Sequence, residues 1–225
     1  MRKRFAIAFI FFCVITHCFS QQIANEKVLN VVVNNTIDDS LTLLETMAND
    51  VNGPNEERVA SSIFLAQLIE QKGDFLKACQ YYTNASAIEG TDTALGQNLL
   101  LDAVRCTLST ADVLRGDFLL STAMANPQNS SIRARANIYA VWSWILKTQS
   151  KDELLGPVSA LEAYLNLDYM VEFKPTILLL LNYITEDSKW DAQLRKEFPL
   201  SPETAIVSDS AKITPSPFWY FDSKY

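Results

Sequence analysis

Apolar side chains recur every three or four residues over long stretches of the chain, whereas alternation of apolar and polar residues over the length of a strand is rare. Such spacing places the apolar residues on one face of a helix and predicts an all-α fold. Val31, Val32 and Val33 form the clearest β-like cluster, and this cluster stands alone.

Turn and cap residues divide this pattern into helices of ordinary length. The expected helices cover residues 40–48, 55–72, 74–89, 92–108, 110–126, 131–148, 152–165, 174–184 and 188–198. Asp38, Asp39 and Ser40 can cap the first of them, and Pro175 stands at the first position of the eighth. Since the connectors are mostly a few residues long, neighbouring helices should run antiparallel. After Pro199 the chain reads as loop.

The four-residue sequence Gly-Asp-Phe-Leu occurs twice, at residues 73–76 and 116–119. In each copy glycine suits a bend, aspartate suits a helix cap, and the two apolar residues suit burial. The recurrence indicates a repeated helix–turn–helix unit. The two copies are 43 residues apart, which indicates an irregular array.

The stretch 59–89 carries small and large residues in the order expected of two closely crossing helices: Leu65, Ala66, Ile69, Gly73, Phe75, Ala78, Tyr82 and Ala85. Methyl-sized side chains let two helices approach to about 8 Å, and the large ones bury area beside them. In this order the stretch resembles a tetratricopeptide repeat, whose family period is 34 residues. The second copy would add Gly116 and Phe118 to the packing residues.

This resemblance implies antiparallel helix pairs stacked as a short, tetratricopeptide-like α-solenoid over residues 55–203. An irregular helical bundle is the alternative. Residues 21–54 would form a helical lead-in, and residues 204–225 a partly extended tail.

The N-terminus has the pattern of a secretory signal peptide over residues 1–20. Arg2, Lys3 and Arg4 precede an apolar run, residues 5–14, that is short for a membrane span. We expect export to a bacterial periplasm or cell envelope. A secreted protein, a retained anchor and a lipoprotein attached through Cys18 are the alternatives, and membrane contact would occur only through this leader.

Removal of the leader would change the available chemistry. The only histidine, His17, would be lost, so general-base catalysis by imidazole and histidine metal ligation are not expected. No EF-hand, P-loop or dinucleotide-binding motif is present, so the sequence predicts no enzyme, no cofactor and no metal site. The remaining 16 basic and 26 acidic residues would disfavour nucleic-acid binding.

Two cysteines, Cys79 and Cys106, would remain in the exported chain. They fall in consecutive expected helices, at heights that allow a disulfide in an oxidising compartment. Two separate buried thiols are the alternative.

The tail contains four consecutive aromatic residues, Phe218, Trp219, Tyr220 and Phe221. One interpretation is that they cover the apolar face of the last helix pair, since terminal repeats need a cap. The other is that they dock onto another protein.

The resemblance and the leader together favour a non-enzymatic scaffold or adaptor for protein–protein interaction, with envelope proteins or peptide segments as partners. A periplasmic ligand-binding subunit associated with a transporter is the alternative. In that case Tyr139, Trp142 and Trp144 would line the ligand pocket.

Overall fold

The computed structural model describes residues 25–208 and residue 210, and within them the fold is all-α with no strand. The expected leader and its Cys18, as well as the aromatic residues 218–221, lie outside the described residues. The chain divides into two compact units, residues 1–61 and 62–225, each of which is described by itself.

In the first unit, α2 (Glu26–Asn34) packs against α3 (Ile37–Asn49), and α4 (Asn55–Gln71) begins. The valine cluster therefore lies in a helix, which corrects the β-like interpretation. Val28 and Val32 are one turn apart on the buried face of α2, and the side chain of Asn25 caps its first turn. Lys27 Nζ lies 2.6 Å from Glu57 Oε2, which links α2 to the start of α4.

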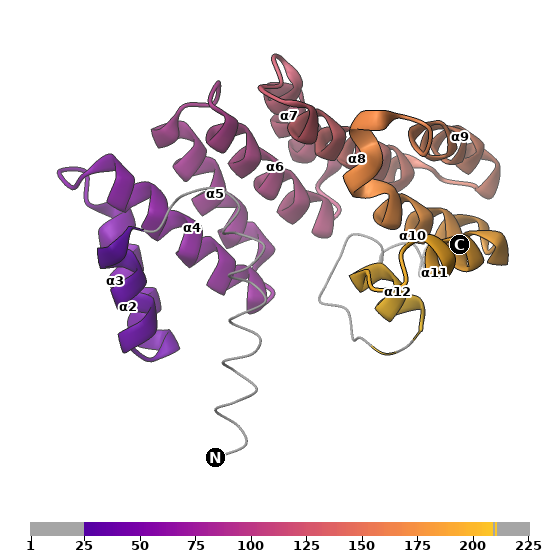
Figure 1. Cartoon of the computed structure of the whole chain (residues 1–225). Helices are drawn as coiled ribbons and strands as arrows, with labels where there is room; N and C mark the ends of the chain where they lie inside the picture. The colour runs from indigo at the N-terminus through magenta and orange to yellow at the C-terminus, as the bar shows by residue number, and fades with distance from the viewer. Residues whose placement is uncertain (1–24, 209, 211–225) are drawn as a thin grey trace. The chain divides into compact units, whose positions relative to one another are not determined.

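The second unit continues from residue 62 with helix pairs (Figure 1). After the C-terminal half of α4 come α5 (Phe75–Glu89), α6 (Ala94–Ser109), α7 (Val113–Met124) and α8 (Ser130–Lys147), and α6 contacts α5, α7 and α8. The short 3-10 helix η1 (Lys151–Leu154) then leads into α9 (Leu155–Tyr164). We call α5, α7 and α9 the second helices of the pairs.

The C-terminal part of this unit is built around α10 (Lys174–Thr185). Five consecutive residues of α10, 177–181, are buried, because the helix contacts α9, the 3-10 helix η2 (Asp168–Phe173), α11 (Ser188–Glu197) and α12 (Pro202–Val207). The sequence pattern missed η2. It also placed loop after Pro199, where the structure has α12, whose first turn is capped by the side chain of Ser201.

The Gly-Asp-Phe-Leu echo does not mark equivalent positions. Gly73 lies in the turn before α5 with a φ of 84°, and Asp74 caps that helix, whereas Gly116 and Asp117 lie inside an unbroken α7. The interpretation of the second copy as a turn is therefore wrong.

The true equivalent of the Gly73 turn is the turn at Ala111 and Asp112, 38 residues later. Ala111 also has a positive φ, 58°, and Asp112 caps α7 as Asp74 caps α5. The backbone bonds match as well: Asp74 N donates to Ile69 O at 3.2 Å, and Asp112 N donates to Thr107 O at 3.0 Å. A helix–turn–helix unit thus recurs in a 38-residue register.

This register explains which predicted packing residues are buried. Ala78 corresponds to Gly116 and Ala85 to Ala123, and all four are buried. Phe118, however, corresponds to the exposed Gln80 rather than to Phe75, so its side chain is 70% exposed. The expectation that Phe118 is buried is corrected accordingly.

The other packing residues predicted in the first copy are mostly inside the protein. The side chains of Leu65, Ala66, Ile69 and Tyr82 are at most 6% exposed, and Phe75 is half-buried. They lie where a closely packed helix pair requires them.

Candidate functional site

A group of large apolar side chains is exposed near the start of α7, the end of α8 and the start of α9. Leu114 and Phe118 on α7 are 81% and 70% exposed, Trp144 on α8 is 47% exposed, and Leu155 on α9 is 71% exposed. We call these four residues the α7–α9 patch.

An acidic residue of α7 ties two sides of the patch together. Ser143 Oγ on α8 donates a hydrogen bond of 2.5 Å to Asp117 Oδ1, and Lys147 forms an ion pair with Oδ2 of the same carboxylate. Leu114 lies one turn before Asp117 on α7, and Trp144 lies one turn before Lys147 on α8. The ion pair therefore holds the turn of α7 that carries Leu114 near the turn of α8 that carries Trp144.

A glycine on α9, Gly156, allows this helix to pack closely against Trp144 of α8. A Cβ atom at Gly156 would lie 2.6 Å from Trp144 Cη2, so the indole ring packs directly on the backbone of α9. Leu155 precedes this glycine at the start of α9. The helices that carry the exposed Trp144 and Leu155 therefore meet at this contact.

The electrostatics of the patch depend on Asp117. Its partial burial works to raise the pKa, but the hydrogen bonds from Lys147 and Ser143, with the charge of Lys147, outweigh burial and hold the pKa below its ordinary 3.8. Because the folded state favours the carboxylate, this contact stabilises the protein above that pH and is lost as the pH falls below it.

Chemically, the patch can bind an apolar partner surface. Exposed apolar groups that gather in one region of a soluble protein mark interaction sites more often than isolated ones do. Aromatic side chains are over-represented among the residues that carry binding energy at interfaces. The central ion pair would add a fixed polar contact within the apolar surroundings.

A second polar feature connects α4, α6 and α8, the first helices of the pairs. Arg105 on α6 pairs with Glu70 on α4 and with Asp102 one turn earlier, and Asp102 pairs with Arg135 on α8. The hydroxyl of Tyr82 on α5 donates to Glu70 Oε2 at 3.1 Å. We call these groups the charge ladder.

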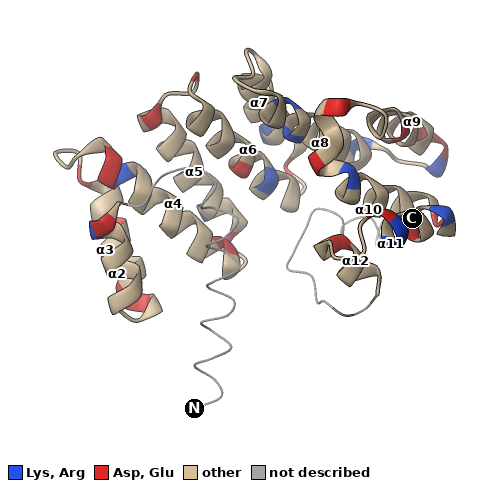
Figure 2. Ribbon diagram, in the orientation of Figure 1, with Lys and Arg blue, Asp and Glu red and all other residues tan. Residues whose placement is uncertain are grey.

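The charge ladder joins helices rather than offering charge to a ligand. It holds two acidic and two basic side chains, each at most 30% exposed, and Figure 2 shows both an acidic and a basic residue on α6. Burial works to lower the pKa of Arg135, but the carboxylate of Asp102 and the ring of Tyr139 raise it, so the guanidinium stays charged. The ladder is therefore a structural connection.

The aromatic residues suggested for a ligand pocket lie mostly in the core. Tyr139 and Trp142 are each 5% exposed, and their ring centroids are 5.0 Å apart. Arg135 Nε donates to Tyr139 Oη at 3.1 Å. Trp144 alone of the three is accessible, and it belongs to the α7–α9 patch.

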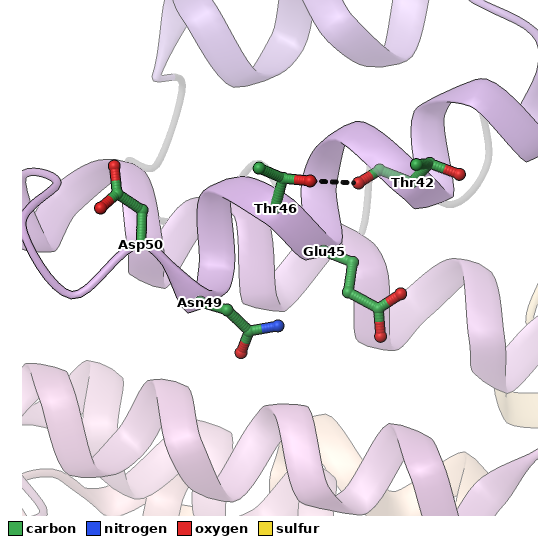
Figure 3. Close-up of a pocket in the computed structure, with 5 residues that line it drawn as sticks. All are labelled: Thr42, Glu45, Thr46, Asn49 and Asp50. Carbon is green, nitrogen blue, oxygen red and sulfur yellow. Dashed lines mark hydrogen bonds between the residues drawn. The ribbon is translucent and has the colours of Figure 1, made fainter.

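A shallow pocket lies along one face of α3 in the first unit (Figure 3). Its lining comes from α3 and its C-cap residue: Thr42, Glu45, Thr46, Asn49 and Asp50. The hydroxyl of Thr46 donates to the backbone oxygen of Thr42 at 3.0 Å, as commonly happens within a helix. A stripe of short polar side chains of this kind offers few groups that converge on one point.

Cys79 and Cys106 are buried free thiols, so the disulfide between them that the sequence allowed is not formed in the structure. Burial raises the pKa of the Cys79 thiol and raises that of Cys106 to about 12. Both therefore stay protonated at neutral pH and act as small apolar side chains. Within the described residues there is also no group of three histidine, cysteine or carboxylate side chains that could hold a metal ion.

Sequence reasoning missed the α7–α9 patch, although part of its signal was present. The pattern aspartate, any residue, leucine, any residue, small residue occurs at 74–78, 112–116 and 152–156. Aligning these segments would have placed Leu76 and Leu114 at equivalent positions, which are both exposed, and Gly156 at the position of Gly116, whereas the equivalent Leu154 is 9% exposed. Among the described residues, no helix is long and apolar enough to cross a membrane.

Comparison with known proteins gives one match. The model of the TP_0752_M family, described as a middle domain, matches residues 146–225, from the last residues of α8 onward. This region includes η1, α9, η2, α10, α11 and α12, and with them Leu155 of the patch. No curated protein and no solved structure matches the chain significantly.

Proposed function

We propose that the protein is a non-enzymatic interaction scaffold of a bacterial cell envelope, and that it binds a partner protein through the α7–α9 patch. The observation that carries this proposal is the exposure of four large apolar side chains around one ion pair on a well-packed helical surface. The expected partner surface is an apolar segment of another envelope protein.

The helical architecture supports the proposal. The same helix–turn–helix turn recurs after 38 residues, four more than the period of the tetratricopeptide repeats that residues 59–89 resemble, a family that typically binds proteins or peptides. The proposed location in the cell envelope rests on the signal-peptide-like sequence of residues 1–20.

The test is affinity capture from envelope extracts of the source bacterium with the full chain as bait. We expect a protein that is recovered by the wild-type chain and lost with Phe118→Asp, because a charge in the centre of the patch must be desolvated on binding. Gln80→Asp is the matched control, since Gln80 is the exposed residue at the equivalent position of α5.

Equal recovery by the two variants would exclude the patch as the docking surface. Recovery of nothing above an unrelated acidic bait would count against the scaffold function itself. Both variants should retain the helical circular dichroism of the wild-type chain, because both substituted side chains are exposed.

A further inference from the structure

The segment 218–221 is the densest group of aromatic side chains in the C-terminal part of the chain. Aromatic side chains bury large areas when they are covered, and four in succession are costly to leave in water. A surface that could cover them in the same molecule needs to be apolar, exposed and within reach.

The chain eight residues before this segment is bound to α12 and α11. Ser210 donates from both its backbone nitrogen and its hydroxyl to Ala205 O, each at 3.0 Å. Arg195 on α11 donates to Val207 O at 2.5 Å and to Ser208 Oγ at 2.6 Å. The last described part of the chain is thus held beside α11.

The α7–α9 patch is within reach of this point. Since α10 contacts both α9 and α11, the axis of α9, which begins at Leu155, is two helix-to-helix steps from that of α11, about 16–20 Å. A further displacement of roughly 10 Å along α11, from Arg195 to Ser188, gives about 19–22 Å when the two distances are combined at right angles. The eight residues from Ser210 to Phe218 can span about 26–29 Å.

We propose that the segment 218–221 binds the α7–α9 patch of the same molecule. Its aromatic rings would cover Phe118, Trp144 and Leu155, and would thereby bury apolar surface on both sides. A partner that uses the patch would then have to displace the segment, which makes the segment a competitive regulator of docking. This inference rests on the same patch as the proposed function but needs no partner protein.

The first test uses a fluorescent peptide of residues 211–225 and a chain that ends at Ser210. The peptide should bind the shortened chain, and the affinity should fall at least about tenfold with Phe118→Asp but not with Gln80→Asp. The full chain should bind the peptide at least about tenfold more weakly, since its own segment competes at millimolar effective concentration. Equal affinity for the full and shortened chains would overturn the proposal, as would absence of binding to the shortened chain.

The second test places a photo-crosslinking phenylalanine analogue at position 118 of the full chain. We expect a product of monomer mass that joins position 118 to residues 218–221. The same analogue at Leu200, which is 97% exposed and outside the patch, is the control. A product of twice the monomer mass would assign the patch to the segment of a second copy, and equal yields at the two positions would overturn the proposal. Neither outcome bears on capture of a partner.

Discussion

At the scale of single residues, the two equivalent turns offer an internal comparison. Gly73 and Ala111 both have a positive φ, which costs an L-amino acid with a side chain about 1–2 kcal/mol. A Cβ atom at Gly73 would meet nothing within 4 Å, so backbone conformation alone sets the cost of adding one.

We therefore expect Gly73→Ala to lower the free energy of unfolding by about 1 kcal/mol. Ala111→Gly should relieve a similar strain, but the more flexible unfolded chain offsets roughly 0.4–1 kcal/mol of that gain. Its net effect should be close to zero or stabilising. Urea denaturation of both variants measures the difference, and equal losses in both would contradict the equivalence of the turns.

Gln97 connects α6 to the loop before α8 and is 2% exposed. Its amide nitrogen donates to Asn126 O at 2.8 Å, and its amide oxygen accepts from Gln128 N at 2.9 Å. Gln97→Leu should destabilise the protein by about 2–4 kcal/mol, because two backbone groups lose their partner. Thermal unfolding measures this loss, and Gln80→Leu on the exposed face of α5 should leave the melting temperature almost unchanged.

At the scale of helices, most of the fold could be predicted because helical periodicity is local. The bounds of α10 and α11 agree with the expected helices to within a residue, since Pro175 and Asp187 mark their starts. The valines of α2 were misread because β-branched residues favour strands in general, whereas here Val28 and Val32 are held by packing against α3.

The candidate site was harder to predict because exposure depends on tertiary contacts. Phe118 was expected to be buried because it occurs in the same Gly-Asp-Phe-Leu sequence as Phe75. The register of the turns instead places it on the exposed face of α7. Half of the Trp144 side chain is buried because Gly156 has no Cβ and lets the ring pack against α9. No local sequence pattern shows this contact between helices.

The charge ladder makes a prediction about coupling between helices. A double-mutant cycle with Glu70→Gln and Arg105→Gln should give a coupling energy of about 1–2 kcal/mol, because both side chains are mostly buried. The pair Asp187 and Lys189 is more exposed, so the same cycle there should give a clearly smaller coupling energy. Similar values for the two pairs would show that the ladder contributes little.

At the scale of the whole molecule, the two buried thiols report on opening of the unit formed by residues 62–225. Cys79 and Cys106 are fully buried and their pKa values are raised, so alkylation of the native protein should be slow even at mildly alkaline pH. Both should react with the same dependence on urea as global unfolding. A cysteine placed at the exposed Ser121 should react without urea, and fast native labelling of Cys106 would contradict this packing.

The central position of α10 has a consequence for biogenesis. A helix that contacts neighbours on all sides needs an apolar stretch, and residues 177–181 provide one. Under the proposed export, this stretch would pass through a translocation channel while unfolded. Its 12-residue helix begins with Lys174 and Pro175 and is far shorter than the roughly 20 residues that a membrane span needs. The channel should therefore release it to the far side rather than into the lipid.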